Sequence, residues 1–599
     1  MKKVLLDNLV FLVLSIVIFV YIVLRAFLIP AYHDEINTFF LYVQTGEFQP
    51  FYSVVDQNNH VLNTLFSHLF FLVFGDHLFV LRLANVLSSL VYLYFVWKIG
   101  KTFKTKALAV SWFLTMVSSL YFISFFSLSR GYGMSMAFII ASVYYLIENY
   151  SRFTYKSLLL GLFASVLALW AYLGLMIPVL LLGGMFISLF LWNLYNSKNF
   201  KPLIFVVPGL ILLFFVPLFY AITYSFYVKT HSTIFGSYGA GFFQSVIFNV
   251  IDEFAAKENS LPGRITMALI LLSLVVSGVI SLKKNRLKSP STLLHILLWG
   301  TLSGIIAMNL LIGVDYPTSR MAAFLFVLII VALYQTINDA DNNLTKYSGY
   351  LISSIFLLQF ILTFNFSYAP CWKYDTVPAS MYSKIAVEAE KTGILPTISA
   401  NEILGREFFY HDFTNNGQLN SSQSNDFPSK IADFIIAHKF TKQNSFPDYD
   451  TVEYNKTTKV FLLQRKSPYI WSEVHSFADS LIEGDSEYMS FIPDLDCEPY
   501  RGRPFCFDIE FNAQSQRFPF RCYLTCDVWD KSNKSLSMNM LELQVIHSDV
   551  SQKTYFHRRQ YLSNIPEEAS KIRFYFFNGF KTEIKISDLK IRFYTGEGN

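Results

Sequence analysis

The chain has 599 residues, of which 53% are hydrophobic, 18% are aromatic and only 15% are charged. Soluble domains carry about 25% charged residues, so much of the surface of this protein does not face water. The formal net charge of +5 is small, and the basic residues are scattered over short loops. This pattern excludes the concentrated basic surface that nucleic-acid-binding proteins use.

The N-terminal segment predicts a membrane anchor. Two lysines precede an apolar run that reaches residue 30. The run is longer than the ~7–15 residues of a signal-peptide core, and no small-residue cleavage site follows it. We therefore expect this segment to stay in the protein as its first membrane span.

Apolar runs of about 20 residues, the length that crosses a bilayer as a helix, recur over the first 366 residues. They predict about eleven spans, near residues 8–30, 78–97, 107–127, 132–149, 157–171, 175–195, 202–222, 263–282, 291–312, 321–338 and 347–366. The run 61–74 is too short to cross and predicts a helix in the membrane interface.

The distribution of basic residues predicts the orientation of these spans. Lysine and arginine gather in one set of short loops, whereas residues 31–77 contain neither. By the positive-inside rule the basic loops are cytoplasmic, which places the N-terminus inside and everything after residue 366 outside. Compact loops and lysine-rich turns favour a bacterial inner (plasma) membrane.

The sequence changes character near residue 367. Segments 429–436 and 458–465 indicate a small α/β unit, and period-2 alternation in 521–530, 541–549, 571–578 and 583–596 predicts strands. We expect a transmembrane domain over 1–366, an extracytoplasmic α/β domain over 367–466 and an extracytoplasmic β-sandwich of jelly-roll type over 467–599. Jelly rolls often bind carbohydrate, but a structural or acceptor-docking role fits equally well.

All five cysteines lie in the last part of the chain, at Cys371, Cys497, Cys506, Cys522 and Cys526. Their spacing does not match a zinc site. If this part is outside the cytoplasm, a disulfide such as Cys497–Cys506 is feasible. Free buried thiols are the alternative, and the sequence does not decide between them.

The loop after the first apolar run holds the first candidate site residues. Asp34 and Glu35 follow the run directly, and a carboxylate held there near a hydroxyl could act as a general base. Two solvated loop acids are the simpler interpretation. Asn59 and His60 follow later in the same loop and could orient a substrate by hydrogen bonds, although capping of the next helix is the ordinary role of such an asparagine.

Single arginines stand at the predicted outer ends of three spans, at Arg82, Arg130 and Arg320. Tyr132 and Asp315 lie near the second and third of them. Arginine forms paired hydrogen bonds with phosphate, so several arginines converging at one membrane face would suit a lipid phosphate. Any one alone would more often contact headgroups.

The order of these motifs resembles a family, the GT-C type membrane glycosyltransferases that include the protein O-mannosyltransferases and the lipid A aminoarabinose transferases. The resemblance covers about residues 1–366 and rests on five short motifs. These are Asp34-Glu35, His60 in NNHVLNTL, Arg82-Leu83 closing GDHLFVLRL, Arg130-Gly131-Tyr132, and Arg320. The family more often has His-Pro-Pro-Leu at the second motif, and this sequence lacks the prolines.

The resemblance implies an inverting hexosyl- or pentosyltransferase of the extracytoplasmic face. It implies a polyprenyl- or dolichyl-phosphate sugar as donor and a hydroxyl of a lipid, glycan or protein as acceptor. Asp34 would be the general base. Glu35 would orient the acceptor or, with Asp34, hold a divalent cation (Mg²⁺ or Mn²⁺) if one takes part.

Further roles follow from the same resemblance. Arg82, Arg130 and Arg320 would stabilise the leaving phosphate. The substrate would be positioned by His60, Asn59, Tyr132 and Asp315.

Three other functions remain open on sequence alone. A membrane polymerase or ligase of lipid-linked glycans would also use outer arginines, but it would need no acid pair after the first span. A lipid or sugar transporter would favour charged groups in mid-membrane, which are scarce here. A glycan-binding receptor would explain the sandwich but not the many spans.

Overall fold

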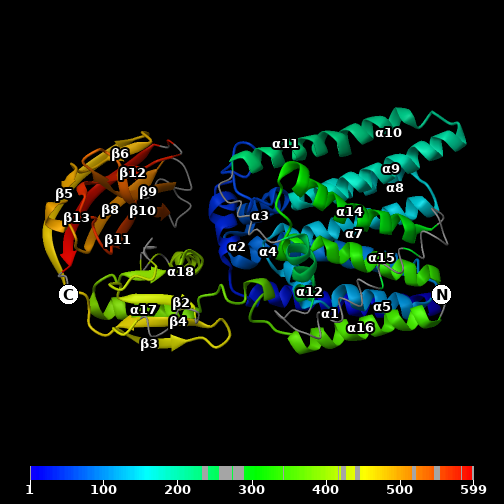
Figure 1. Ribbon diagram of the computed structural model, residues 1–599, viewed down its shortest axis with the longest axis horizontal. Helices are drawn as coiled ribbons and strands as arrows, with labels where there is room; N and C mark the ends of the chain where they lie inside the picture. The colour runs from blue at the N-terminus through cyan, green and yellow to red at the C-terminus, as the bar shows by residue number, and fades with distance from the viewer. Residues whose placement is uncertain are drawn as a thin grey trace. The chain divides into compact units, whose positions relative to one another are not determined.

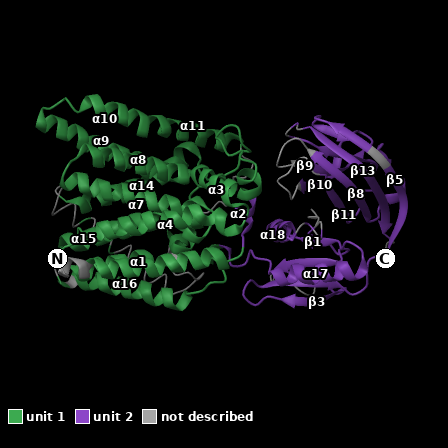
Figure 2. Cartoon of the chain, turned by 180° about the vertical axis from the view of Figure 1, so that it is seen from behind, with its two compact units in different colours: residues 1–30, 38–371 green, residues 31–37, 372–599 purple. Residues whose placement is uncertain are grey.

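The computed structural model divides into two compact units, which Figure 2 distinguishes by colour. The first unit holds residues 1–30 and 38–371, and the second holds residues 31–37 and 372–599. The structure describes residues 2–231, 241–254, 273, 279, 289–340, 343–415, 417, 419, 427–438, 446–515, 521–544, 553–579, 581 and 583–596.

The first unit is helical, and its helices run side by side in Figure 1. They are α1 (Lys2–Leu28), α3 (Val61–Phe74), α4 (Leu78–Gly100), α5 (Lys106–Val117), α6 (Leu120–Ser124), α7 (Gly131–Ser151), α8 (Tyr155–Ala171), α9 (Met176–Ser197), α10 (Leu203–Leu210), α11 (Val216–His231), α12 (Asn249–Phe254), α14 (Pro290–Ile312), η6 (Ser319–Ala322), α15 (Phe324–Ala340) and α16 (Asn343–Thr363). The short helix α2 (His33–Thr38) lies where the two units adjoin in sequence.

Local signals set the helix ends. At α14, the side chain of Ser289 accepts a hydrogen bond from the Ser291 N–H, and Pro290 is the first helical residue. Both features satisfy or remove N–H groups that a helix start leaves unpaired. Gly313, with φ +66°, ends the same helix in the left-handed conformation that glycine adopts without steric cost.

Among the described helices, seven are long and apolar enough to cross a membrane, or eight if α5 and the helix after it form one bent span. Seven or eight of the eleven predicted spans therefore meet this criterion within the described residues. The run 157–171 forms α8 with only 17 residues, and α16 begins with the polar sequence NLTKYS. The run 263–282 lies almost wholly outside the described residues.

The outward-facing side chains of these helices are apolar. Leu12 on α1 is 57% exposed, Phe205 on α10 is 80% exposed and Leu212 beyond it is 68% exposed. Exposing such side chains to water would cost about 25 cal/mol per Å², whereas lipid tails accept them. In contrast, α15 is buried on nearly all sides. The chain is therefore an integral membrane protein.

The second unit contains a small α/β region and a β-sandwich. In the α/β region, a four-stranded sheet of order β1-β2-β4-β3 packs with two helices, and only β1 and β2 are parallel. These elements are α17 (Ala379–Thr392), β1 (Ile398–Ala400), α18 (Glu402–Thr414), β2 (Phe434–His438), β3 (Tyr449–Tyr454) and β4 (Val460–Arg465).

The sandwich consists of the sheets β10-β9-β12-β6, in which β7 also pairs with β12, and β11-β8-β13-β5. Its strands are β5 (Trp471–Gly484), β6 (Tyr488–Ser490), β7 (Leu495–Asp496), β8 (Phe505–Ser515), β9 (Arg521–Asp530), β10 (Ser535–Gln544), β11 (Thr554–Leu562), β12 (Ala569–Phe577) and β13 (Ile584–Gly596). This strand order is the jelly-roll arrangement, as predicted. The predicted strand 541–549 is described only to Gln544, as the end of β10.

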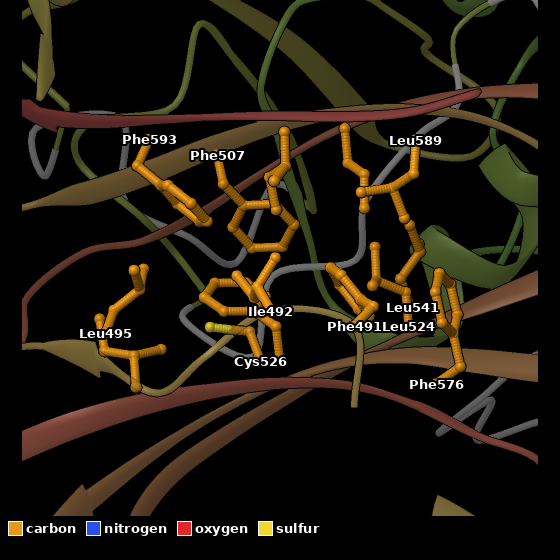
Figure 3. Packing of buried hydrophobic residues seen from close by; sticks show 14 of the residues in the cluster. Phe491, Ile492, Leu495, Phe507, Leu524, Cys526, Leu541, Phe576, Leu589 and Phe593 are labelled. Atoms are coloured by element: carbon orange, nitrogen blue, oxygen red, sulfur yellow. The ribbon is translucent and has the colours of Figure 1, made fainter. Parts of the chain in front are cut away.

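The inner faces of the two sheets meet in a cluster of phenylalanine, leucine and isoleucine side chains, of which Figure 3 shows fourteen. Phe507, Phe574 and Phe593 lie at its centre with ring centroids 5.1 Å apart between neighbours. All five cysteines are free thiols, and four of them are buried. Cys522 and Cys526 point to the same face of β9, because residues four apart on a strand share a face.

Candidate functional site

In the first unit, Arg130 anchors a buried polar cluster at the start of α7. Its Nη1 donates to Thr38 Oγ1 at 3.1 Å, and its Nη2 donates to Asn58 Oδ1 at 2.9 Å. The guanidinium lies 5.8 Å from the ring centre of Tyr132. Asn58 is held in turn by Asp56, whose side chain accepts from the Asn58 N–H at 2.7 Å. A fixed cation thus stands beside neutral oxygens and an aromatic ring.

Gly131 permits this cluster to form. A Cβ at this position would lie 1.9 Å from the carbonyl oxygen of Ala171 and 2.8 Å from His60 Nδ1. Backbone atoms cannot yield to such a contact as a flexible side chain can. The glycine between Arg130 and Tyr132 therefore has a packing reason: it lets α7 begin directly against His60 and the end of α8.

His60 brings three rings together. Its Nδ1 lies 3.0 Å from the carbonyl oxygen of Ala171, which fixes the imidazole plane. The ring is 4.9 Å from Tyr132 in an edge-on arrangement and 5.9 Å from Tyr172, and the two tyrosines are 5.0 Å apart. Rings with polar groups at their edges suit a ligand that combines apolar faces with hydroxyl groups, as a sugar does.

Asn59 is buried beside His60 and helps to hold the loop before α3. Its Nδ2 donates to the carbonyl oxygen of Phe48 at 3.0 Å and to Ser53 Oγ at 3.3 Å. The hydroxyl of Tyr224, on α11, faces the side chains of Ser53 and Asn59. Asn59 does not cap α3, because the residue before that helix is His60.

Arg320 lies in η6, close enough to the Tyr172 hydroxyl to affect it electrostatically. The preceding Ser319 has φ +49°, a conformation that costs a non-glycine residue about 1 kcal/mol or more. Its hydroxyl is 3.1 Å from that of Tyr121, a contact that helps to hold this turn. Asp315 is exposed in the loop before η6.

Arg82 is buried on α4 and contacts the end of α1. Its guanidinium donates to the carbonyl oxygens of Ala26, Ile29 and Pro30 at 3.1, 2.8 and 2.6 Å. The Ala26 carbonyl is one that the end of α1 leaves unpaired, and Ile29 and Pro30 follow the helix directly. Arg82 therefore fixes the point at which the chain leaves the first span, just before the acidic pair.

The acidic pair belongs to the second unit, with the rest of residues 31–37. Asp34 and Glu35 are 4% and 3% exposed, in the first turn of α2. His33 Nε2 lies 3.3 Å from Asp34 Oδ1, and His33 Nδ1 lies 3.9 Å from Asp375 Oδ2. The two acids are thus buried groups with defined neighbours and not solvated loop residues.

Sequence reasoning missed three residues of these arrangements. Arg25, inside the first apolar run, donates to the backbone oxygens of Asn365 and Tyr368 and to Ser124 Oγ. An arginine within such a run was a visible signal. Tyr172 and Tyr224 carried no comparable signal, because tyrosines are common at the ends of membrane helices.

The predicted cation site has only the Asp34–Glu35 pair as candidate ligands. Within the described ranges, no group of three or more His, Cys, Asp or Glu side chains is arranged to hold a metal ion. Two adjacent acids are fewer ligands than magnesium or manganese sites commonly use.

Comparison with known proteins gives no family. No family model and no curated protein matches the sequence. Among solved structures, ArnT from Cupriavidus metallidurans in the apo state aligns with TM-score 0.42 and 10% identity, over 76% of this chain and 97% of ArnT.

Two further structures align over most of this chain. The arabinosyltransferase EmbB from Mycobacterium smegmatis has TM-score 0.34 and 10% identity, over 98% of this chain and 64% of EmbB. The Archaeoglobus fulgidus oligosaccharyltransferase has TM-score 0.36 and 10% identity, over 93% and 98%. Identities and TM-scores this low do not assign the chain to a family or a function.

Proposed function

We propose that the protein is a membrane glycosyltransferase. It transfers one hexose or pentose from a polyprenyl-phosphate donor to a hydroxyl of a lipid, glycan or protein acceptor at the extracytoplasmic face, with inversion at the anomeric carbon. The observation that carries the proposal is the cluster of Arg130, His60, Tyr132 and Tyr172 in the first unit. It combines a buried guanidinium with rings and amides in the motif order that resembles GT-C enzymes.

The donor phosphate would bind to Arg130 and Arg320. Negative charge builds on the phosphate oxygen as its bond to the sugar breaks, and fixed cations lower the barrier most where charge develops. His60, Asn59 and Tyr132 would position the sugar. Arg82 would act on the site mainly through its bonds to the end of α1.

Asp34 would accept the proton of the acceptor hydroxyl. The acceptor oxygen then bonds to the anomeric carbon while the bond from that carbon to the phosphate oxygen breaks. The electron pair of the broken bond leaves with the polyprenyl phosphate. The reaction is balanced without an oxidant, a reductant or a metal ion.

The test of this proposal compares two acids in membranes supplied with a labelled polyprenyl-phosphate sugar. Asp34→Asn should lower the rate of transfer by about 10²-fold or more, because a positioned base contributes 10²–10⁴-fold. Asp76→Asn is the control, since Asp76 is an exposed acid between α3 and α4, and it should keep the wild-type rate. Equal rates in both variants at equal protein level would remove Asp34 as the base.

The arginines are tested by donor affinity. Arg130→Ala and Arg320→Ala should each weaken donor binding, whereas Arg82→Ala should mainly lower the amount of folded protein. Arg130→Lys keeps the charge but cannot span both Thr38 and Asn58, so it should also weaken binding. Wild-type donor affinity in both alanine variants would overturn the phosphate site.

A further inference from the structure

The segment that carries the acidic pair is bound into the α/β region of the second unit. Tyr32 stacks on Trp372 with ring centroids 5.6 Å apart and an interplanar angle of 27°. Both side chains are almost fully buried. The backbone N–H of His33 faces the carboxyl group of Glu407. Residues more than 300 positions apart in sequence thus form one packed arrangement.

Glu407 lies on α18 and is 2% exposed. Its Oε2 accepts a hydrogen bond from the Val377 N–H at 2.7 Å, and the His33 N–H is the second backbone donor that the carboxyl faces. A single side chain thereby connects α18 to the loop at residue 377 and to the residue before Asp34. Such a connection restrains the backbone where α2 begins.

Other titratable groups surround this connection. Asp375 and Glu35 are near enough to act on the Glu407 carboxyl electrostatically. Burial raises the pKa of Glu407 well above its ordinary value, and these two acids raise it further, while the two N–H groups oppose the shift. His411 Nε2 bonds the carbonyl oxygen of Val377 at 2.9 Å, on the other side of the same residue.

We propose that Glu407 is a positioning residue for Asp34: by holding the His33 backbone on α18, it fixes where the catalytic carboxylate stands. This inference rests on the proposed function, in which Asp34 is the base. A misplacement of about 1 Å in a reacting group can lower a rate by about 10²-fold, so one buried anchor can matter as much as a direct contact. The α/β region then contributes to catalysis by positioning Asp34.

The test uses the full-length protein and three variants. Glu407→Ala removes the anchor, and Glu407→Gln keeps an acceptor oxygen of nearly the same shape. Asp412→Ala is the matched control on the same helix. Asp412 is also buried and accepts from the Tyr382 hydroxyl at 3.0 Å and the Leu419 N–H at 2.8 Å, both within the α/β region.

For Glu407→Ala we expect kcat to fall by about 10- to 100-fold with the KM for the donor unchanged. Glu407→Gln should recover most of kcat. Asp412→Ala should lose about as much thermal stability as Glu407→Ala. Its kcat should stay within about twofold of the wild-type value, because the substitution leaves residues 31–37 in place. An unchanged kcat in Glu407→Ala, or an equal loss in Asp412→Ala, would overturn the inference.

Backbone hydrogen exchange separates this inference from the proposed function, because it needs no activity. Exchange in a peptide covering residues 31–37 should become faster in Glu407→Ala and stay slow in Glu407→Gln and Asp412→Ala. If exchange behaves in this way but Asp34→Asn retains full transfer, the proposed base is wrong and the anchor is right. Unchanged exchange in Glu407→Ala contradicts the anchor itself.

Discussion

The two units bury their interiors in different ways. In the helical unit, Arg25, Arg82 and Arg130 are almost fully buried among apolar helices, and each donates hydrogen bonds to particular oxygens. At the centre of the sandwich the side chains are mainly phenylalanine, leucine and isoleucine, which pack without directional bonds. The stability of the first interior therefore depends on individual hydrogen bonds, and that of the second depends on close packing of apolar side chains.

This difference explains why the arginines of the candidate site could be identified from the sequence. A polar residue within an apolar helix is costly unless it has a partner or a function, so its position is informative. Alternation along a strand identifies the sandwich core but marks no particular residue as functional.

The largest effect on stability is expected in the sandwich. Phe574 is 1% exposed and lies 5.1 Å from both Phe507 and Phe593, so Phe574→Ala leaves a cavity in packed volume. We expect the free energy of unfolding of the second unit to fall by about 3–5 kcal/mol. Urea-dependent proteolysis of this unit in membranes measures the change.

The control for this prediction is Tyr488→Ala on β6 of the same sandwich. Tyr488 is 61% exposed, and its loss should change stability by no more than about 0.5 kcal/mol. A loss of stability as large as that of Phe574→Ala would show that close packing in the core does not distinguish the two positions.

In the helical unit, we expect the rate of sugar transfer to depend on Gly131. Gly131→Ala forces a Cβ against the Ala171 carbonyl, so α7 must move relative to His60. We expect transfer to fall by about 10²-fold. Gly184→Ala on α9 is the matched control, since nothing lies within 4 Å of its Cβ position, and it should retain activity. Equal activities would show that the close approach at Gly131 is not needed.

Glu407 should make the stability of the second unit depend on pH. The pKa of Glu407 is raised in the folded protein, whereas in the unfolded chain the carboxyl group loses its proton above about pH 4.5. The free energy of unfolding is therefore highest below that pH, where both states hold the proton. It falls as the pH rises toward the pKa of the folded state. The slope is at most about 1.4 kcal/mol per pH unit. Glu407→Gln cannot titrate, and the difference in slope between it and the wild type measures the effect. Parallel curves would contradict the raised pKa.

The smallest expected effect concerns thiol reactivity. Burial raises the pKa of Cys506 and Cys522 to about 12 and that of Cys497 to about 11, so these thiols are almost never ionised near neutral pH. A maleimide should label Cys371 first in the native protein and all five thiols after denaturation. Rapid native labelling of Cys522 would contradict the packed sandwich.

The sequence predicted helices and strands well where a single hydrophobic pattern runs through the whole element. The strand predicted at 521–530 and the short helix predicted at 61–74 have those same bounds in the structure. In contrast, the predicted span 107–127 is interrupted at Ser118 and Ser119, with a bend of 60°. Hydropathy averages over such a break, because serine is neither strongly polar nor a helix terminator on its own.

Contacts between distant residues could not be predicted in the same way. The motif order pointed to Arg82, but its partners lie 52 to 56 residues earlier in the chain and are backbone oxygens, which any residue provides. Likewise, nothing near Asp34 in sequence indicates that Trp372 and Glu407 hold its segment.

The most direct test of the account follows the phosphate of the donor. The purified full-length protein receives a polyprenyl-phosphate sugar with one label on the sugar and a second label on the phosphate, together with a lipid extract as acceptor. We expect the sugar label to move to the acceptor while an equal amount of the phosphate label stays on free polyprenyl phosphate, and both changes to be lost in Asp34→Asn. A product that carries both labels, or transfer that Asp34→Asn leaves intact, would contradict it.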